Sequence, residues 1–225
     1  MLLAVYFPCR CGPPALFSST YARRGLAPWP IMTPSMLLTA WRLPLPSACP
    51  VNRSLPLEHL QSPVSASFSE REFRNALGQF ATGVAVVTAL APDGNKVGLT
   101  ISSFNSASLT PPLVLWSLMK TASSMPVFET VSHYAINVMG AHQKELALQF
   151  SRKGIDRWAG VEYEVGVTGV PLLAGAIASF ECRNGPHHDA GDHVILVGEV
   201  AHCQHVVGVP PLLYHGGNFY TEQLI

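Results

Sequence analysis

Short blocks of apolar residues recur along the chain from about residue 68, and they predict more strands than helices. The β-branched run 84–90 is followed by a turn at 92–95, and Lys96 starts the return strand of a hairpin over 84–103. Most connections are too short for the crossovers that parallel strands need, so the pattern favours a mainly β antiparallel barrel over a doubly wound sheet. Further apolar runs predict strands at 113–118, 134–139, 175–183 and 193–200, with a loop at 184–192.

A few helices are expected to flank these strands. Ser69 and Glu72 have the spacing of a capping box, and apolar residues then repeat at helical intervals up to Phe80. This pattern predicts a helix over about 69–81 with one face buried. Shorter helices are predicted at 125–130 and 143–150.

A polar stretch, 98–112, lies between two of the predicted strands and is rich in small and hydroxyl-bearing residues. Buried hydroxyls need hydrogen-bond partners, so a soluble core rarely carries so many of them between apolar strands. One interpretation is a polar ligand lying flat on the strand, held by backbone amides and short hydroxyls. The alternative is a serine-rich surface loop, and the spacing alone leaves both open.

Residues 1–66 form a Pro- and Arg-rich tail that differs from the domain predicted over 67–225. Eleven of the 19 prolines fall in this tail, and its first 57 residues hold five arginines and no acid. Prolines at this density interrupt helices and sheets, and they disfavour the amphipathic helix of a transit peptide. We therefore favour a disordered tail, or an upstream extension absent from the working protein, over a cleaved leader.

The charge and cysteine content narrow the class of protein. The formal net charge is zero, but from Glu58 onward nine Lys and Arg face 14 Asp and Glu, a net of about −5. This balance gives no basic patch for nucleic acid, and no apolar run approaches the length of a membrane-spanning helix. Only Cys182 and Cys203 lie in the domain, both in apolar runs, which favours a reducing compartment and a cytoplasmic location.

Several familiar kinds of site have little support. The chain has neither the glycine pattern of a Rossmann site nor a P-loop, and no arrangement suggests a hydrolase. Two histidine-rich segments, 187–193 and 202–205, could contain metal ligands, but alternating strand residues and a loop rarely converge on one ion, so no metal is expected. Lys120 stands beside several hydroxyls and could hold a phosphate, or be solvated. The cations of 151–158 could guard an anionic ligand or form a solvated loop.

Six segments, taken in order, resemble the flavin reductase family that has an FMN-binding split barrel. The resemblance covers about 68–220 and leaves the tail uncovered. The segments are FATGVAVVT at 80–88, GLTISSF at 98–104, SLTPPLV at 108–114, NV at 137–138, GDH at 191–193 and PLLYHGGNFY at 211–220.

This resemblance implies a split β-barrel homodimer that uses NADH or NADPH to reduce FMN or FAD, and that supplies reduced flavin to a partner monooxygenase. His193 and Tyr220 would lie near the nicotinamide, and no residue would act as a catalytic nucleophile or acid. A flavin-binding electron carrier and an enzyme resembling pyridoxamine-phosphate oxidase remain alternatives. The implied flavin contacts are Thr100, Ile101, Ser102, Ser103, Ser117, Leu118, Met119, Lys120, Ser123 and Ser124.

Overall fold

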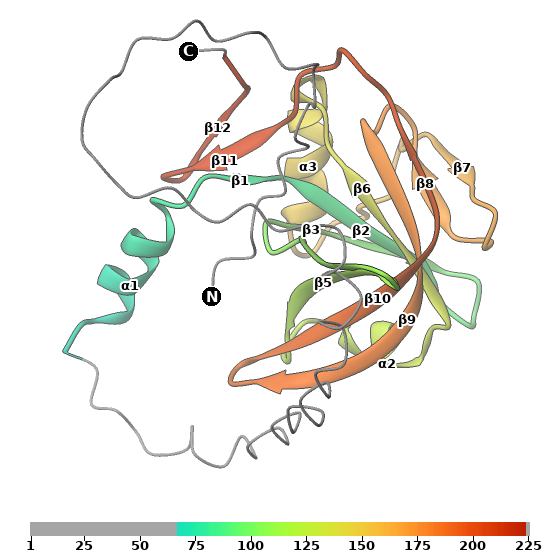
Figure 1. The fold of residues 1–225 in the computed structure, drawn as a ribbon, viewed down its shortest axis with the longest axis horizontal. Coiled ribbons are helices and arrows are strands. Elements are labelled where there is room, and N and C mark those ends of the chain that lie inside the picture. Colours follow the sequence, from blue (N-terminus) through green and yellow to red (C-terminus); the bar gives the residue numbers. More distant parts are fainter. Residues whose placement is uncertain (1–66, 224–225) are drawn as a thin grey trace, which may run out of the picture. The chain divides into compact units, whose positions relative to one another are not determined.

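The computed structural model describes residues 67–223, and this part of the chain is mainly β, as predicted (Figure 1). Every strand pair in it is antiparallel. The tail predicted over 1–66 lies outside the described residues. The helices are α1 (Glu70–Leu77), α2 (Met125–Thr130), η3 (Ala141–Gln143) and α3 (Lys144–Ser151). The strands are β1 (Thr82–Gly83), β2 (Ala85–Leu90), β3 (Lys96–Ile101), β4 (Asn105–Leu109), β5 (Pro112–Met119), β6 (His133–Val138), β7 (Tyr163–Val165), β8 (Pro171–Leu173), β9 (Ala178–Ala190), β10 (His193–His205), β11 (Leu213–His215) and β12 (Asn218–Tyr220).

A seven-stranded sheet in the order β3-β2-β6-β9-β10-β5-β4 carries most of the fold. Its two edge strands, β3 and β4, are consecutive in the chain, and only 102–104 connect them. Four Cα steps span at most about 14 Å. The edges of a flat seven-stranded sheet would lie about 29 Å apart. The sheet must therefore curl until its edges approach each other, and in Figure 1 its strands wrap around a common interior.

The interior of this curl holds the main apolar core, drawn from β2, β3, β5, β6, β9, β10 and α2. Three fully buried aromatic rings meet edge to face there. The Trp116 ring centre lies 5.0 Å from that of Phe128 and 5.7 Å from that of Tyr134. Edge-to-face packing adds to the free energy gained by burying such large side chains.

The loop predicted at 184–192 is wrong, because β9 continues through Ala190 and pairs with β10. Only Gly191 and Asp192 turn the chain, and Gly191 adopts a left-handed φ of 71°. The side chains near this turn are polar and exposed, so they carry no apolar alternation by which a strand is recognised. Backbone pairing between β9 and β10 nevertheless forms a hairpin here.

The capping box of α1 is confirmed, whereas the predicted burial of the helix is wrong. The Ser69 amide donates to Glu72 Oε2 at 2.7 Å, and the Glu72 amide donates to Ser69 Oγ at 3.3 Å. The helix ends at Leu77, and none of its residues is buried. Phe73, Leu77 and Phe80 are 50%, 57% and 75% exposed. An amphipathic pattern shows that one face of a helix is apolar enough to be buried. It does not show whether that face packs against the same chain or against another molecule.

No helix within residues 67–223 combines the length and the apolar character needed to cross a bilayer.

Glu181 is a buried carboxylate, 1% exposed, held by the loop before β8. The amide of Val167 donates to Oε1 at 3.1 Å, and the amide and hydroxyl of Thr168 donate to Oε2 at 2.7 and 2.6 Å. Burial alone would raise the pKa of Glu181, but the hydrogen bonds from Thr168 and Val167 outweigh it, and the pKa is lowered. The folded state therefore prefers the ionised form.

Replacing Glu181 with glutamine is expected to lower the free energy of unfolding at pH 7 by about 2 kcal/mol. A charged carboxylate that accepts three hydrogen bonds is then replaced by a neutral amide with one acceptor oxygen. A lowered pKa contributes stability above the unfolded value of 4.5, and this contribution is lost as the pH falls below it. Urea unfolding at pH 7 and at lower pH should show the difference between Glu181→Gln and the native chain shrinking with acid. A difference independent of pH would contradict this account.

Candidate functional site

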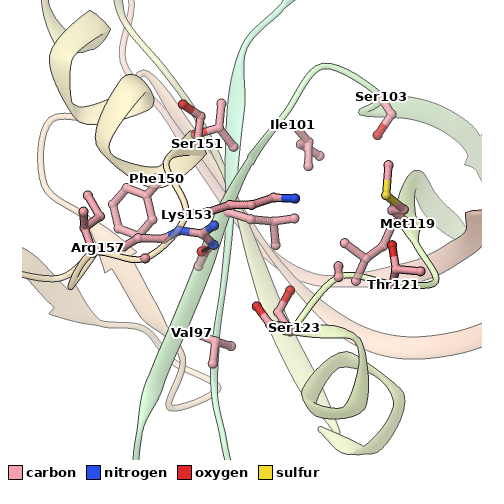
Figure 2. Close-up of a pocket in the computed structure, with 18 of the residues that line it drawn as sticks. Val97, Ile101, Ser103, Met119, Thr121, Ser123, Phe150, Ser151, Lys153 and Arg157 are labelled. Atoms are coloured by element: carbon pink, nitrogen blue, oxygen red, sulfur yellow. Dashed lines mark hydrogen bonds between the residues drawn. The ribbon is translucent and has the colours of Figure 1, made fainter.

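A cavity of about 850 Å³ lies between three parts of the chain (Figure 2). They are β3 with the residues after it, the end of β5 with the turn before α2, and the segment that follows α3. Most of the residues predicted to bind flavin or nicotinamide line it: Thr100, Ile101, Ser102, Ser103, Ser117, Leu118, Met119, Ser123, Ser124 and His193.

The β3 wall is fixed by close packing against α3. A Cβ added at Gly98 would lie 2.6 Å from Phe150 Cε1, so only glycine lets this buried ring approach the strand. The Thr100 hydroxyl donates to the Ala147 carbonyl of α3 at 2.6 Å. Its only proton is therefore used inside the protein, and its lone pairs are what it can offer a ligand.

Ser103 and Ser117 join the two strand walls. The Ser117 amide donates to Ser103 Oγ at 3.0 Å, and Ser103 Oγ donates to the Ser117 carbonyl at 3.3 Å. This pair holds the residues after β3 against β5. Ser102, which precedes Ser103 in the chain, is exposed and lines the cavity.

Lys120, the cation predicted to face a phosphate, lies outside the lining of the cavity. Its ammonium contacts both carboxylate oxygens of Asp189, at 2.7 and 2.8 Å. Asp189 lies in β9, 69 positions further along the chain, so no local sequence pattern indicates this partner. The hydroxyl residues beside it, including Thr121 and Ser123, do line the cavity.

His193 and Tyr220, both predicted to lie near the nicotinamide, are not brought together. His193 begins β10, lines the cavity and pairs in register with Met119 of β5. Its Nδ1 lies 2.7 Å from Asp192 Oδ1, and this hydrogen bond, then the charge of His193, lowers the pKa of Asp192. Tyr220 belongs to β12 of the separate sheet β1-β11-β12, and its ring lies 6.1 Å from His215.

The third wall, 151–158, was left open by the sequence as either a solvated loop or a guard of an anionic ligand. The structure places most of it along the cavity. Arg157 fastens it, because Nη1 donates to the Gly98 carbonyl at 2.9 Å and Nε to the Arg152 carbonyl at 2.7 Å. Trp158 packs edge to face on Phe150, with ring centres 5.2 Å apart. The cluster of cations was the one signal in the sequence for this wall.

The lining combines apolar strand residues, short hydroxyls and an excess of positive charge. Lys96, Lys153 and Arg157 line the cavity, with Asp156 the one carboxylate among its lining residues. Such a donor set fits an amphipathic, anionic ligand with a flat apolar part and a phosphate, as a flavin nucleotide has. In the part of the chain that the structure describes, no three His, Cys, Asp or Glu side chains are placed to share a metal ion.

Comparisons with known proteins agree with this geometry. The model of the flavin reductase like domain matches residues 77–223. FMN reductase (NADH) SmoA of Agrobacterium fabrum is 47% identical over 165 residues, which are 73% of this chain and 92% of that protein. The reductase component of the flavin-dependent trigonelline monooxygenase of Acinetobacter baylyi is 40% identical over 67% of this chain, and the match spans about half (48%) of that protein.

Among solved structures, the NADH:FAD oxidoreductase SgcE6 of Streptomyces globisporus, in complex with NAD and FAD fragments, matches with a TM-score of 0.64 and 33% identity. The match covers 69% of this chain and 96% of that one. The chain therefore belongs to the flavin reductase family, and the resemblance seen in its sequence is confirmed.

Proposed function

We propose that this protein is an NAD(P)H-dependent flavin reductase, which passes a hydride from the nicotinamide of NADH or NADPH to FMN or FAD. The observation that carries the proposal is the cavity along β3, where an apolar strand, short hydroxyls and cations line one space. The relatives support it, since one is named FMN reductase (NADH) and another NADH:FAD oxidoreductase.

The residues of the cavity would bind and orient rather than react. The flavin supplies the hydride-accepting chemistry when it is bound. Leu99 and Ile101 of β3 line the cavity and would offer an apolar surface to a flat ring. Backbone amides near Ser102 and Ser103 would hold the polar edges of that ring. The task of the chain is to hold two rings face to face and exclude water, so no side chain is needed as a nucleophile.

Mixing the purified protein with NADH and FMN or FAD, and following the absorbance of NADH, tests the activity. Loss of NADH absorbance that depends on both protein and flavin is expected. A protein that binds flavin tightly yet consumes no NADH or NADPH would instead be a flavin carrier, and the proposal would fail. The same assay decides between FMN and FAD and between NADH and NADPH.

His193→Ala is expected to raise the KM for NADH about tenfold, a loss of ~1.4 kcal/mol, with flavin affinity changed only a few-fold. The imidazole lines the cavity, two residues after the turn residue Gly191, whose φ of 71° lets the backbone reverse direction there. There it can bond the carboxamide of the nicotinamide. If flavin binding collapses while the KM for NADH stays constant, the role assigned to His193 is wrong.

We also propose that the curled sheet is the split barrel implied by the family resemblance. Its support is the connection 102–104, which joins the two edge strands β3 and β4, and the main apolar core, to which six strands of the sheet contribute. The Ser103–Ser117 hydrogen bonds join the connection between β3 and β4 to β5. An experimental structure with β3 far from β5 would contradict the proposal.

A homodimer is the assembly that best explains the uncovered surfaces of the described chain. Phe73, Leu77 and Phe80 present an apolar face on and after α1, and Met119 at the cavity is 45% exposed. A second copy could cover both and exclude water from the flavin. Sedimentation should show a dimer, and a fully active monomer at micromolar concentration would contradict this.

The partner and location follow from the same proposal. Reduced flavin reacts with oxygen, and a relative is named as the reductase component of a monooxygenase. We propose that this chain likewise supplies reduced flavin to a flavin-dependent monooxygenase. A cytoplasmic location remains a prediction, supported by the free thiols of Cys182 and Cys203.

A further inference from the structure

Three cationic side chains line the cavity, and they differ in whether the protein already engages them. Lys96 Nζ lies 4.4 Å from the centre of the Tyr163 ring and 3.2 Å from its hydroxyl. Arg157 donates to two backbone carbonyls. Among the hydrogen bonds and ion pairs within residues 67–223, none involves the ammonium of Lys153. Lys153 therefore has its charge available to a ligand.

The position of Lys153 suits such a role. Figure 2 shows its side chain extending into the cavity from the segment after α3, with the ammonium directed toward the side of Met119 and Thr121. The hydroxyls of Thr121 and Ser123 line that side. Hydroxyl donors facing a lysine are a combination that binds phosphate oxygens.

The other charges near the cavity leave this role to Lys153. Lys120, outside the lining of the cavity, is compensated by Asp189 at 2.7 Å. Asp156, the carboxylate of the lining, accepts a hydrogen bond from the Trp158 amide at 2.9 Å and so caps its own segment. The loop is held by Arg157, so the stem of Lys153 starts from an anchored backbone.

We propose that Lys153 is a specificity-determining residue, which binds a phosphate group of the nucleotide held in this cavity. The inference rests on the proposed function. The same phosphate chemistry can come from the 5′-phosphate of the flavin or from the phosphates of NADH and NADPH. In either case Lys153 discriminates a phosphorylated ligand from the same ligand without its phosphate.

The first experiment measures flavin binding by fluorescence quenching, with no turnover, for FMN and for riboflavin, which lacks the phosphate. If the flavin supplies the phosphate, Lys153→Gln should weaken FMN binding about tenfold and riboflavin binding less than twofold. Lys153→Arg should restore most of the loss. Arg152→Gln is the matched control, since it removes the same charge from the neighbouring residue, whose side chain does not line the cavity.

The second experiment identifies a phosphate on the pyridine nucleotide. With riboflavin as the electron acceptor, no flavin phosphate is present, and the KM values for NADH and NADPH report on the nucleotide alone. A rise of about tenfold in either KM for Lys153→Gln, with FMN binding unchanged, would assign Lys153 to the nucleotide phosphate.

The proposal is overturned if Lys153→Gln weakens FMN and riboflavin equally with both KM values unchanged, or if it matches Arg152→Gln throughout. A native chain that binds flavin but consumes no NADH would count against the proposed function. The comparison of FMN with riboflavin binding would still test the role of Lys153, because flavin binding needs no reaction. Thermal unfolding should be alike for both variants, since both side chains are exposed.

Discussion

Gly198→Ala is expected to lower the free energy of unfolding by about 3 kcal/mol or more. Gly198 lies in β10, opposite Val114 of β5. An added Cβ would collide with the hydroxyl of Tyr134 and lie 2.9 Å from Cys182 Cβ. Tyr134 is fully buried in the aromatic cluster, so its ring cannot move aside without repacking the core. Urea unfolding monitored by circular dichroism would measure the loss.

Tyr134→Phe supplies the control for this collision. The Tyr134 hydroxyl is buried and has no hydrogen-bond partner among the described residues, so its removal alone should cost little. In the double variant with Gly198→Ala, more than half of the lost stability should return. Gly83→Ala is a matched substitution, because a Cβ there meets nothing within 4 Å. A double variant as unstable as Gly198→Ala alone would show that the hydroxyl is not the obstacle.

Gly98→Ala is expected to weaken flavin binding at least tenfold and to destabilise the fold by about 2 kcal/mol. Its Cβ would lie 2.6 and 2.9 Å from two carbons of the Phe150 ring. That ring supports Trp158, and both line the cavity, so the collision would displace the wall of the site. Fluorescence titration with FMN gives the affinity, and thermal unfolding gives the stability.

Trimming the ring separates the two effects of Gly98→Ala. In Gly98→Ala with Phe150→Leu, the smaller side chain should relieve the collision and recover part of the affinity. The comparison is with Phe150→Leu alone, which leaves space in the core and costs stability of its own. If the double variant binds flavin no better than Gly98→Ala, the path from Gly98 through Phe150 to the site is wrong.

Local patterns allowed much of the fold and part of the site to be predicted. Ser69 and Glu72 contact each other through one helical turn, so their capping box could be read directly. The mainly antiparallel β class followed from short apolar runs with short connections. The strand stretch at Thr100 to Ser103 was recognised because many hydroxyls stood together, and the structure places these residues along the cavity.

The features that were missed depend on residues far apart in the sequence. The partner of Lys120 is Asp189, 69 positions away, and no local pattern announces such a pair. The hairpin around Gly191 has polar side chains on exposed backbone, so its strands lack the apolar alternation. The assignment of Tyr220 to the nicotinamide rests on family resemblance and stays a prediction. This residue lies in β12, which pairs with β11 outside the seven-stranded sheet.

The strand order has a consequence for the order of assembly. Within the described sheet, β5 lies between β4 and β10, so β10 is the strand that connects it to β9 and the rest of the sheet. The cavity needs β3 on one side and β5 on the other, and it is therefore complete only when β10, near the end of the chain, has docked. Such distant pairing makes folding slow. A flavin that binds only the completed cavity would stabilise the native state by mass action, by an amount that grows with the flavin concentration.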